Sequence, residues 1–249
     1  MACVTVERLD TPRGELVLRR AGPHYEIVSN GTFLMDTRNG ASERELVRAA
    51  VGSPRRPARV LLAGLGVGFS LAEALGSARV GSVTVVEVEP AVVGWHRRGG
   101  PLEPFSAGGL ADPRVTVIVA DLAGWLAAGT DRYDVVCLDV DNGPEWTVTA
   151  GNAALYADAG LDALGRRLAP GGTLAVWSAA AAPAFERRLR ARYASVDVLC
   201  VPVPRGEPDV IYLARDHWAG QAARPPVRDR ARSPSTGTRS AAGGPGRTP

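Results

Sequence analysis

The chain has 249 residues, of which 45% are hydrophobic and 22% charged, with a formal net charge of +3. This composition fits one large globular domain, or one domain with a small appendage, and excludes a wholly disordered or fibrous chain. No stretch approaches about 18 uninterrupted apolar residues, so we expect no membrane span. Three cysteines without paired spacing predict neither a disulfide framework nor a metal site, and they favour a cytoplasmic protein.

The positive charge is concentrated at the C-terminal end. Residues 219–249 contain six arginines and one aspartate, so this segment carries +5 and the rest of the chain −2. The segment is also rich in Pro, Ser and Gly, and we expect it to be a disordered tail. Because the remaining chain is slightly acidic, nucleic-acid binding is not expected.

Residues 1–53 are predicted to form a small β-hairpin unit followed by a first helix. Strand composition is found at residues 15–19, 25–29 and 32–35. Asn30-Gly31 separates the last two of these runs and is a strong hairpin signal. Residues 42–51 predict a helix, with Ser42 as its N-cap and Glu45 as the capping-box partner.

The next segment, residues 60–90, has the pattern of a strand, a glycine turn, a helix and a second strand. Three glycines follow the first apolar run at alternate positions: Gly64, Gly66 and Gly68. Such glycines let the backbone approach a ligand and turn sharply into a helix whose first N–H groups are free. Glu87 ends the second strand, where a carboxylate accepts both hydroxyls of a ribose. The pattern predicts a nucleoside-bearing ligand, with a tight turn and a solvated acid as the alternative.

The rest of the chain alternates between strands and helices. Further strands are predicted at residues 115–119, 133–140 and 173–178, and helices at residues 91–98, 121–128, 153–168 and 184–193. Residues 196–201 and 209–214 are predicted to be a closing antiparallel pair. This alternation predicts an α/β fold, a doubly wound and mostly parallel Rossmann-like sheet over residues 54–218.

The glycine turn and the acidic loop together indicate which class of nucleoside ligand the chain binds. The dinucleotide motif requires a sixth-position glycine, which is Phe69 here. GLGVG followed by VEVEP instead resembles motif I and the acidic loop of the class I S-adenosylmethionine-type transferases. That resemblance implies a fold of the class I methyltransferase type and an adenosyl sulfonium ligand.

Acidic residues follow two later strands, at the sheet edge where ligands bind in such folds. Asp121 can accept a hydrogen bond from an adenine amino group, or serve as the N-cap of the next helix. Asp139 and Asp141 lie two residues apart, and paired carboxylates beside a sulfonium suit a cationic amine substrate. One carboxylate holds an ammonium while the other takes the proton from the attacking nitrogen. The alternative is an ordinary turn at residues 142–144 that Asp141 caps.

Over roughly residues 14–215 the order of motifs resembles the polyamine aminopropyltransferases, the spermidine and spermine synthase family. The resemblance rests on GLGVG, VEVEP, VAD and YDVVCLDVDNGP followed by LY. In that family decarboxylated S-adenosylmethionine donates an aminopropyl group to putrescine or a related amine. By position, the resemblance implies that Glu87 binds the ribose and Asp121 binds the adenine. It implies that Asp139 is the acid at the reacting centre. It implies a homodimer, and it matches Asp141 to the second acid of a shortened loop.

Three positions depart from the family pattern. Val67 replaces the aspartate of the glycine motif, which holds the donor's aminopropyl ammonium. Glu43-Arg44 replaces the tyrosine-glutamine pair that lines the amine site. The acidic loop is compressed to residues 139–144.

Three functions follow. The first is an aminopropyltransferase that uses decarboxylated S-adenosylmethionine and an amine acceptor, with Asp139 and Asp141 as catalytic residues. The second is a methyltransferase that uses intact S-adenosylmethionine, whose carboxylate lies against the N–H groups after Gly66. The third is a non-catalytic scaffold that binds an adenosyl ligand. None of the three requires a metal or a membrane.

Overall fold

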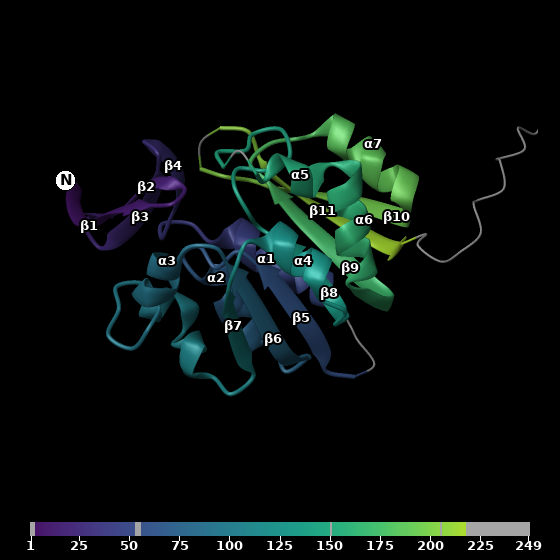
Figure 1. Cartoon of the computed structure of the whole chain (residues 1–249), viewed down its shortest axis with the longest axis horizontal. Coiled ribbons are helices and arrows are strands. Elements are labelled where there is room, and N and C mark those ends of the chain that lie inside the picture. The colour runs from purple at the N-terminus through teal and green to yellow at the C-terminus, as the bar shows by residue number, and fades with distance from the viewer. Residues whose placement is uncertain (1–2, 53–55, 150, 205, 218–249) are drawn as a thin grey trace, which may run out of the picture.

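The computed structural model describes residues 3–52, 56–149, 151–204 and 206–217 (Figure 1). The predicted tail at residues 219–249 lies outside the described residues. Within them the chain forms a small antiparallel sheet and a larger mixed sheet covered by helices. No helix in these ranges is long and apolar enough to cross a membrane.

The N-terminal sheet is a four-stranded meander in the order β1-β2-β3-β4. Its strands are β1 Cys3–Thr11, β2 Gly14–Ala21, β3 His24–Ser29 and β4 Thr32–Asp36. Asn30 and Gly31 turn the chain between β3 and β4 with φ angles of 50° and 76°, as the hairpin signal predicts. The sequence prediction missed β1, because this edge strand is exposed on both faces and has no buried alternating residues.

The larger sheet has the strand order β10-β11-β9-β8-β5-β6-β7. Its strands are β5 Ala58–Ala63, β6 Val80–Glu87, β7 Val115–Val119, β8 Tyr133–Leu138, β9 Leu168–Ser178, β10 Tyr193–Val201 and β11 Asp209–His217. The first five are parallel, and β11 pairs antiparallel with both β9 and β10. This confirms the predicted doubly wound, mostly parallel α/β fold. The strand order reverses between β5 and β8, where such sheets open a crevice for ligands.

Helices cover both faces of the larger sheet (Figure 1). They are α1 Ala41–Val51, α2 Phe69–Gly76, α3 Pro90–Trp95, α4 Leu122–Ala128, α5 Ala153–Tyr156, α6 Asp158–Arg166 and α7 Pro183–Arg192. One apolar core contains buried residues of α1, α2 and α3, and a second contains those of α4 to α7. Two short 3₁₀ helices, η1 Glu103–Ser106 and η2 Gly109–Ala111, lie in the glycine-rich loop before β7.

Two local predictions are corrected. Ser42 is not the N-cap of α1, which begins at Ala41 after Gly40, and no side chain caps it. The Ser42 hydroxyl instead lies 2.6 Å from Asp209 Oδ2, and Glu45 pairs with Arg48, so tertiary and surface partners replace the capping box.

The predicted helix at residues 153–168 is two helices, α5 and α6. They separate at Ala157, whose φ of −78° and ψ of 169° are extended rather than helical. A Cβ at Gly160 would lie 2.2 Å from the carbonyl oxygen of Ala154, so only glycine allows α6 to pack this closely on α5. The break therefore results from close packing between α5 and α6, which a helical pattern in the sequence does not reveal.

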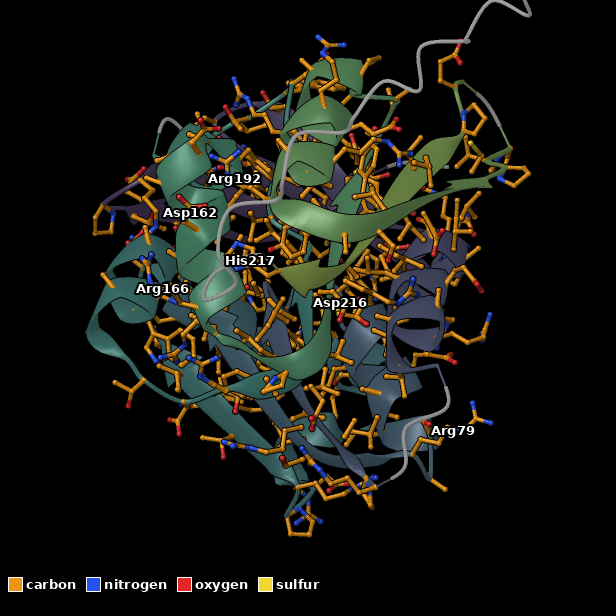
Figure 2. The ribbon with its side chains drawn as sticks, turned by 90° about the vertical axis from the view of Figure 1, so that its right-hand side faces the viewer. Arg79, Asp162, Arg166, Arg192, Asp216 and His217 are labelled. Carbon is orange, nitrogen blue, oxygen red and sulfur yellow. The ribbon has the colours of Figure 1, made fainter. Side chains whose placement is uncertain are left out.

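Figure 2 shows the side of the molecule that lies at the right in Figure 1, where Asp162 and Arg166 of α6 lie beside His217 at the end of β11. Arg192 binds Asp158 and Asp162, and His217 lies 4.0 Å from Asp162. A Cβ at Gly165 would lie 2.5 Å from the His217 ring, so only glycine lets α6 approach the end of β11 this closely. None of these residues lines the cavity described below.

The N-terminal sheet and the larger sheet share one apolar core. Leu18 and Ile27 of the small sheet belong to the same buried cluster as Leu46 of α1 and Leu62 of β5. The predicted boundary at residue 53 therefore does not separate two independent cores.

We expect Leu18→Ala to destabilise the whole described fold. Leu18 is 0% exposed, and truncating such a side chain costs about 2–5 kcal/mol of unfolding free energy. Urea denaturation should show one transition with a lower midpoint. Val119→Ala is the control, because Val119 is 49% exposed and the change should stay within about 0.5 kcal/mol. Two separate transitions would contradict the shared core.

Candidate active site

A cavity of about 570 Å³ opens at the carboxyl ends of the parallel strands. Its walls come from the N-terminal sheet, the turn after β5, the ends of β6 and β8, the start of α4 and the start of β11. Six predicted site residues line it: Gly64, Gly66, Glu87, Asp121, Asp139 and Asp141. The structure therefore brings together four strand ends that are up to 77 residues apart in the sequence.

The glycine turn has three glycines with positive φ, which only glycine adopts without strain. A Cβ at Gly64 would lie 2.3 Å from the carbonyl oxygen of Asp139, so this glycine lets the end of β5 approach the end of β8. A Cβ at Gly66 would collide with the sulfur of Met35. Gly68 does not line the cavity, and it packs against His96 and Ser106 on the opposite side of the turn.

The Glu87 carboxylate is buried, and backbone N–H groups fix its position. Oε2 accepts from Leu65 at 2.9 Å and Oε1 accepts from Glu89 at 2.8 Å. Burial raises the pKa of Glu87, and these hydrogen bonds oppose the rise by favouring the ionised form. Each carboxylate oxygen keeps a second lone pair, so both can still accept from a ligand.

The N-terminal sheet contributes Arg13 to the cavity wall beside Glu87. Arg13 Nε donates to Glu89 Oε1 at 2.6 Å, and its Nη2 donates to the carbonyl of Val88 at 2.8 Å. The hydrogen bond to Glu89 raises the pKa of Arg13, so this guanidinium stays charged. Sequence reasoning missed Arg13, because it lies in the turn after the unpredicted strand β1.

Asp121 combines two expected features. It is the N-cap of α4, and its Oδ1 accepts from the N–H of Gly124 at 2.9 Å. It also lines the cavity next to Leu122. The capping alternative is thus confirmed, and the residue is placed where a ligand can contact it.

Asp139 follows β8 and is half-buried in the cavity wall. Burial, together with the nearby acids Glu43 and Asp209, raises the pKa of Asp139 to about 8, and a hydrogen bond from Ser70 opposes the rise. An aspartate in this environment holds a proton near neutral pH unless a cation enters the cavity.

We name Glu43, Asp139 and Asp209 the acid group. Glu43 comes from α1 and Asp209 from the start of β11, and burial raises the pKa of both carboxyls. Ser42 Oγ lies 3.1 Å from Glu43 Oε2 and 2.6 Å from Asp209 Oδ2. Within the described residues, no salt bridge to Arg or His involves any member.

Asp141 has a different environment from Asp139. Its φ is 57°, and its Oδ2 accepts from the side-chain amide of Asn152 at 2.7 Å. It therefore holds the loop after β8 through Thr149 and Asn152, which lie beyond the turn at residues 142–144 that the alternative has Asp141 cap, and it still lines the cavity. Trp146 of the same loop is 59% exposed at the cavity mouth.

Comparisons with known proteins identify the family. Residues 41–189, more than half of the chain, match the spermine/spermidine synthase domain. The chain belongs to the spermine/spermidine synthase family.

Two curated relatives illustrate its range. Polyamine aminopropyltransferase 1 of Streptomyces coelicolor is 38% identical over 133 residues, which are 53% of this chain and 24% of that protein. Putrescine N-methyltransferase 2 of Nicotiana tabacum is 27% identical over 165 residues, 64% of this chain and 44% of that protein. The match thus spans only part of these relatives.

The fold is shared with solved spermidine synthases. A spermidine synthase in complex with the transition state analogue AdoDATO superposes with a TM-score of 0.71 at 17% identity, covering 85% of this chain and 73% of that chain. Spermidine synthase from Thermotoga maritima superposes with a TM-score of 0.68 at 17% identity, covering 85% and 72%. At this identity the similarity concerns the fold.

The structure shows where the residues that depart from the spermine/spermidine synthase pattern lie relative to the cavity. Val67 is 2% exposed in the core and does not line the cavity, so no charge replaces the family's aspartate at that position. Arg44 lies over the Phe69 ring, 4.8 Å from its centre, and does not line the cavity either. Glu43 does line it. The substituted pair therefore presents an acid to the cavity, without the arginine beside it.

The raised pKa of Asp139 predicts that the ligand-free protein loses stability as the pH rises. The carboxyl pKa rises from 3.8 to about 8 on folding, so the folded chain holds the extra proton between these values. The free energy of unfolding therefore falls with increasing pH across this window. Asp139→Asn carries no titrating proton there.

Thermal denaturation of the ligand-free protein should show this difference. We expect Asp139→Asn to be more stable than the wild type at about pH 8.5, and the gain to shrink towards zero near about pH 4. Asp131→Asn, at an exposed carboxylate, is the matched control. A constant difference across the pH range would contradict the raised pKa.

Proposed function

We propose that the chain transfers an aminopropyl group from decarboxylated S-adenosylmethionine to an amine acceptor. The acid group carries this proposal, because it lines one end of the cavity without a basic partner. Buried carboxylates are costly unless a cation or a proton neutralises them. A ligand with an ammonium group supplies that charge.

The other end of the cavity supports an adenosyl donor. Glu87 is fixed by two backbone N–H groups and is available to the ribose hydroxyls. Asp121 lines the same end and is available to the adenine amino group. Gly66 of the turn after β5 lines the same cavity. A donor held at Glu87 and Asp121 would direct its sulfonium towards Asp139.

The reaction then requires that the amine be positioned against the donor and that the attacking nitrogen lose one proton. A neutral amine nitrogen attacks the carbon bound to the sulfonium, a C–N bond forms and the C–S bond breaks. The sulfur keeps the electron pair and leaves as a neutral thioether, 5′-methylthioadenosine. The attacking nitrogen transfers its extra proton to Asp139, whose carboxyl, with a raised pKa, is a stronger base than an ordinary aspartate.

Methyl transfer to an amine from intact S-adenosylmethionine is the second candidate. The putrescine N-methyltransferase relatives and the uncharged Val67 favour it. The N–H groups after Gly66, however, already have partners. Val67 N–H donates to Met35 Sδ at 3.2 Å and Gly68 N–H to the carbonyl of Leu65 at 3.0 Å. A donor carboxylate would also lie near the acid group, and the two repel each other once the acid group is ionised to hold an ammonium.

We further propose that the protein is a homodimer of the cytoplasm. The three cysteines are free, which supports a reducing compartment. The exposed face of β1, with Val4 and Val6 at its surface, supports a subunit contact.

The donor is tested by calorimetric titration with intact and decarboxylated S-adenosylmethionine side by side. We expect the decarboxylated form to bind about tenfold more tightly or better, because it lacks the repelled carboxylate. Glu87→Ala should weaken both by about 1.5–3 kcal/mol. Preference for the intact donor would favour methyl transfer, and binding of neither would refute the adenosyl site.

The catalytic role of Asp139 is tested with Asp139→Asn. We expect kcat for aminopropyl transfer to fall about 10²- to 10⁴-fold, because the asparagine amide cannot take the proton from the attacking nitrogen. The affinity for the donor should stay within about threefold, since the ribose and adenine contacts remain. Asp131→Asn serves again as the surface control. An unchanged rate would exclude Asp139 as the proton acceptor.

A further inference from the structure

A histidine and a serine lie directly behind the glycine turn, on the side away from the cavity. His96 follows α3 and is 1% exposed, and Ser106 ends η1. A Cβ at Gly68 would lie 2.7 Å from His96 Cε1 and 2.7 Å from Ser106 Cβ. The glycine-rich loop before β7 thus brings Ser106 beneath the turn that borders the cavity.

The hydrogen bonds of His96 determine its protonated nitrogen. Nε2 lies 2.9 Å from the carbonyl oxygen of Gly66, which only accepts, so Nε2 carries a proton. Burial lowers the pKa of His96, and the neutral ring has one proton, so Nδ1 carries none and lies 3.0 Å from Ser106 Oγ. The Ser106 hydroxyl donates to the carbonyl of Glu103 at 3.1 Å. The Gly66 carbonyl therefore determines the tautomer of His96.

The Gly66–Val67 peptide has its two polar groups on opposite sides. Its carbonyl accepts from His96, and its N–H donates to the sulfur of Met35, which lines the cavity. In a trans peptide the C=O and N–H point in opposite directions, so holding one fixes the other. His96 thus determines which edge of this peptide faces the cavity. Thioether sulfur is a weak acceptor, which leaves the N–H poorly held from the cavity side.

An apolar side chain would fill this space at a lower desolvation cost. A buried imidazole and hydroxyl must be dehydrated, and they are retained without penalty only if their hydrogen bonds are made. What the pair adds beyond packing is the N–H donated to Gly66.

We propose that His96, whose Nε2 donates to the Gly66 carbonyl, is a positioning residue for the adenosyl donor. It anchors the Gly66 carbonyl from behind, and the turn then presents a fixed surface to the donor. The inference rests on the proposed function, because it places the donor against this turn. His96 itself touches neither the donor nor the acceptor.

The test compares His96→Leu with His96→Gln. Leucine fills the space without an N–H, whereas the glutamine amide can donate to the Gly66 carbonyl. We expect His96→Leu to raise the Kd of 5′-methylthioadenosine and the KM of the decarboxylated donor about tenfold, with kcat and the amine KM nearly unchanged. His96→Gln should stay within about threefold of the wild type. His24→Leu, at a histidine outside the cavity, is the matched control.

Hydrogen exchange of the peptide spanning residues 60–71 provides a readout that needs no ligand. We expect faster exchange in His96→Leu than in His96→Gln or the wild type. If Leu and Gln weaken binding equally, or if Leu changes neither binding nor exchange, the positioning role is refuted.

Two further outcomes keep the test decisive. If the wild type binds no adenosyl compound, the proposed function fails, and the exchange comparison alone decides the anchoring role. If His96→Leu does not fold, His96→Phe replaces it, because phenylalanine keeps a flat ring without an N–H. We then expect a loss of donor affinity in the same direction, and no loss would refute the proposal.

Discussion

The carboxylate of Glu87 is the contact on which the arrangement of this cavity depends. Strand pairing holds β5 and β6 side by side but leaves the turns at their ends unsupported. Glu87 accepts one N–H from the turn after β5 and another from the start of α3, so it ties these two segments together. Because both of its oxygens are held by the backbone, the carboxylate keeps one orientation towards the cavity. The glycine turn and Asp139 line the same cavity as this carboxylate, so the proposed sites for the ribose and for the reaction lie beside it.

Glu87 stabilises the wall of the cavity, whereas the acid group destabilises the ligand-free protein. Three carboxyls from α1, β8 and β11 converge with raised pKa values and no basic partner within the described residues. The fold tolerates this arrangement through hydrogen bonds from Ser42 and Ser70 and through bound protons. The cationic ligand proposed above would replace those protons and remove the repulsion, so part of its binding energy would be stored in the ligand-free protein.

Much of this site was predictable because parallel strands end at one edge of their sheet. The apolar runs in the sequence predicted the strands. The acids at or just after the strand ends were therefore predicted to lie along one wall of the cavity: Glu87, Asp121 and Asp139. The sequence did not predict that Arg13 and Asp209 line the cavity. Both lie beside turns of antiparallel hairpins, and no general rule says which edge of a sheet such turns face. The capping box failed because Ser42 bonds Asp209 across the fold, and no local pattern encodes a partner 167 residues away. Gly68 has a positive φ like its neighbours, and only the structure shows that it serves packing.

The strand order has a consequence for the synthesis of the chain. β11 lies between β9 and β10, so β10 leaves the ribosome before the strand that connects it to the sheet. Asp209 opens β11 and meets Ser42 of the first helix, which joins the beginning and the end of the fold at the cavity wall. A nascent chain that has already formed the glycine turn and Glu87 thus still lacks one wall of the cavity. That wall is complete only when β11 has inserted between β9 and β10, so a ligand that contacts it can bind only after this step.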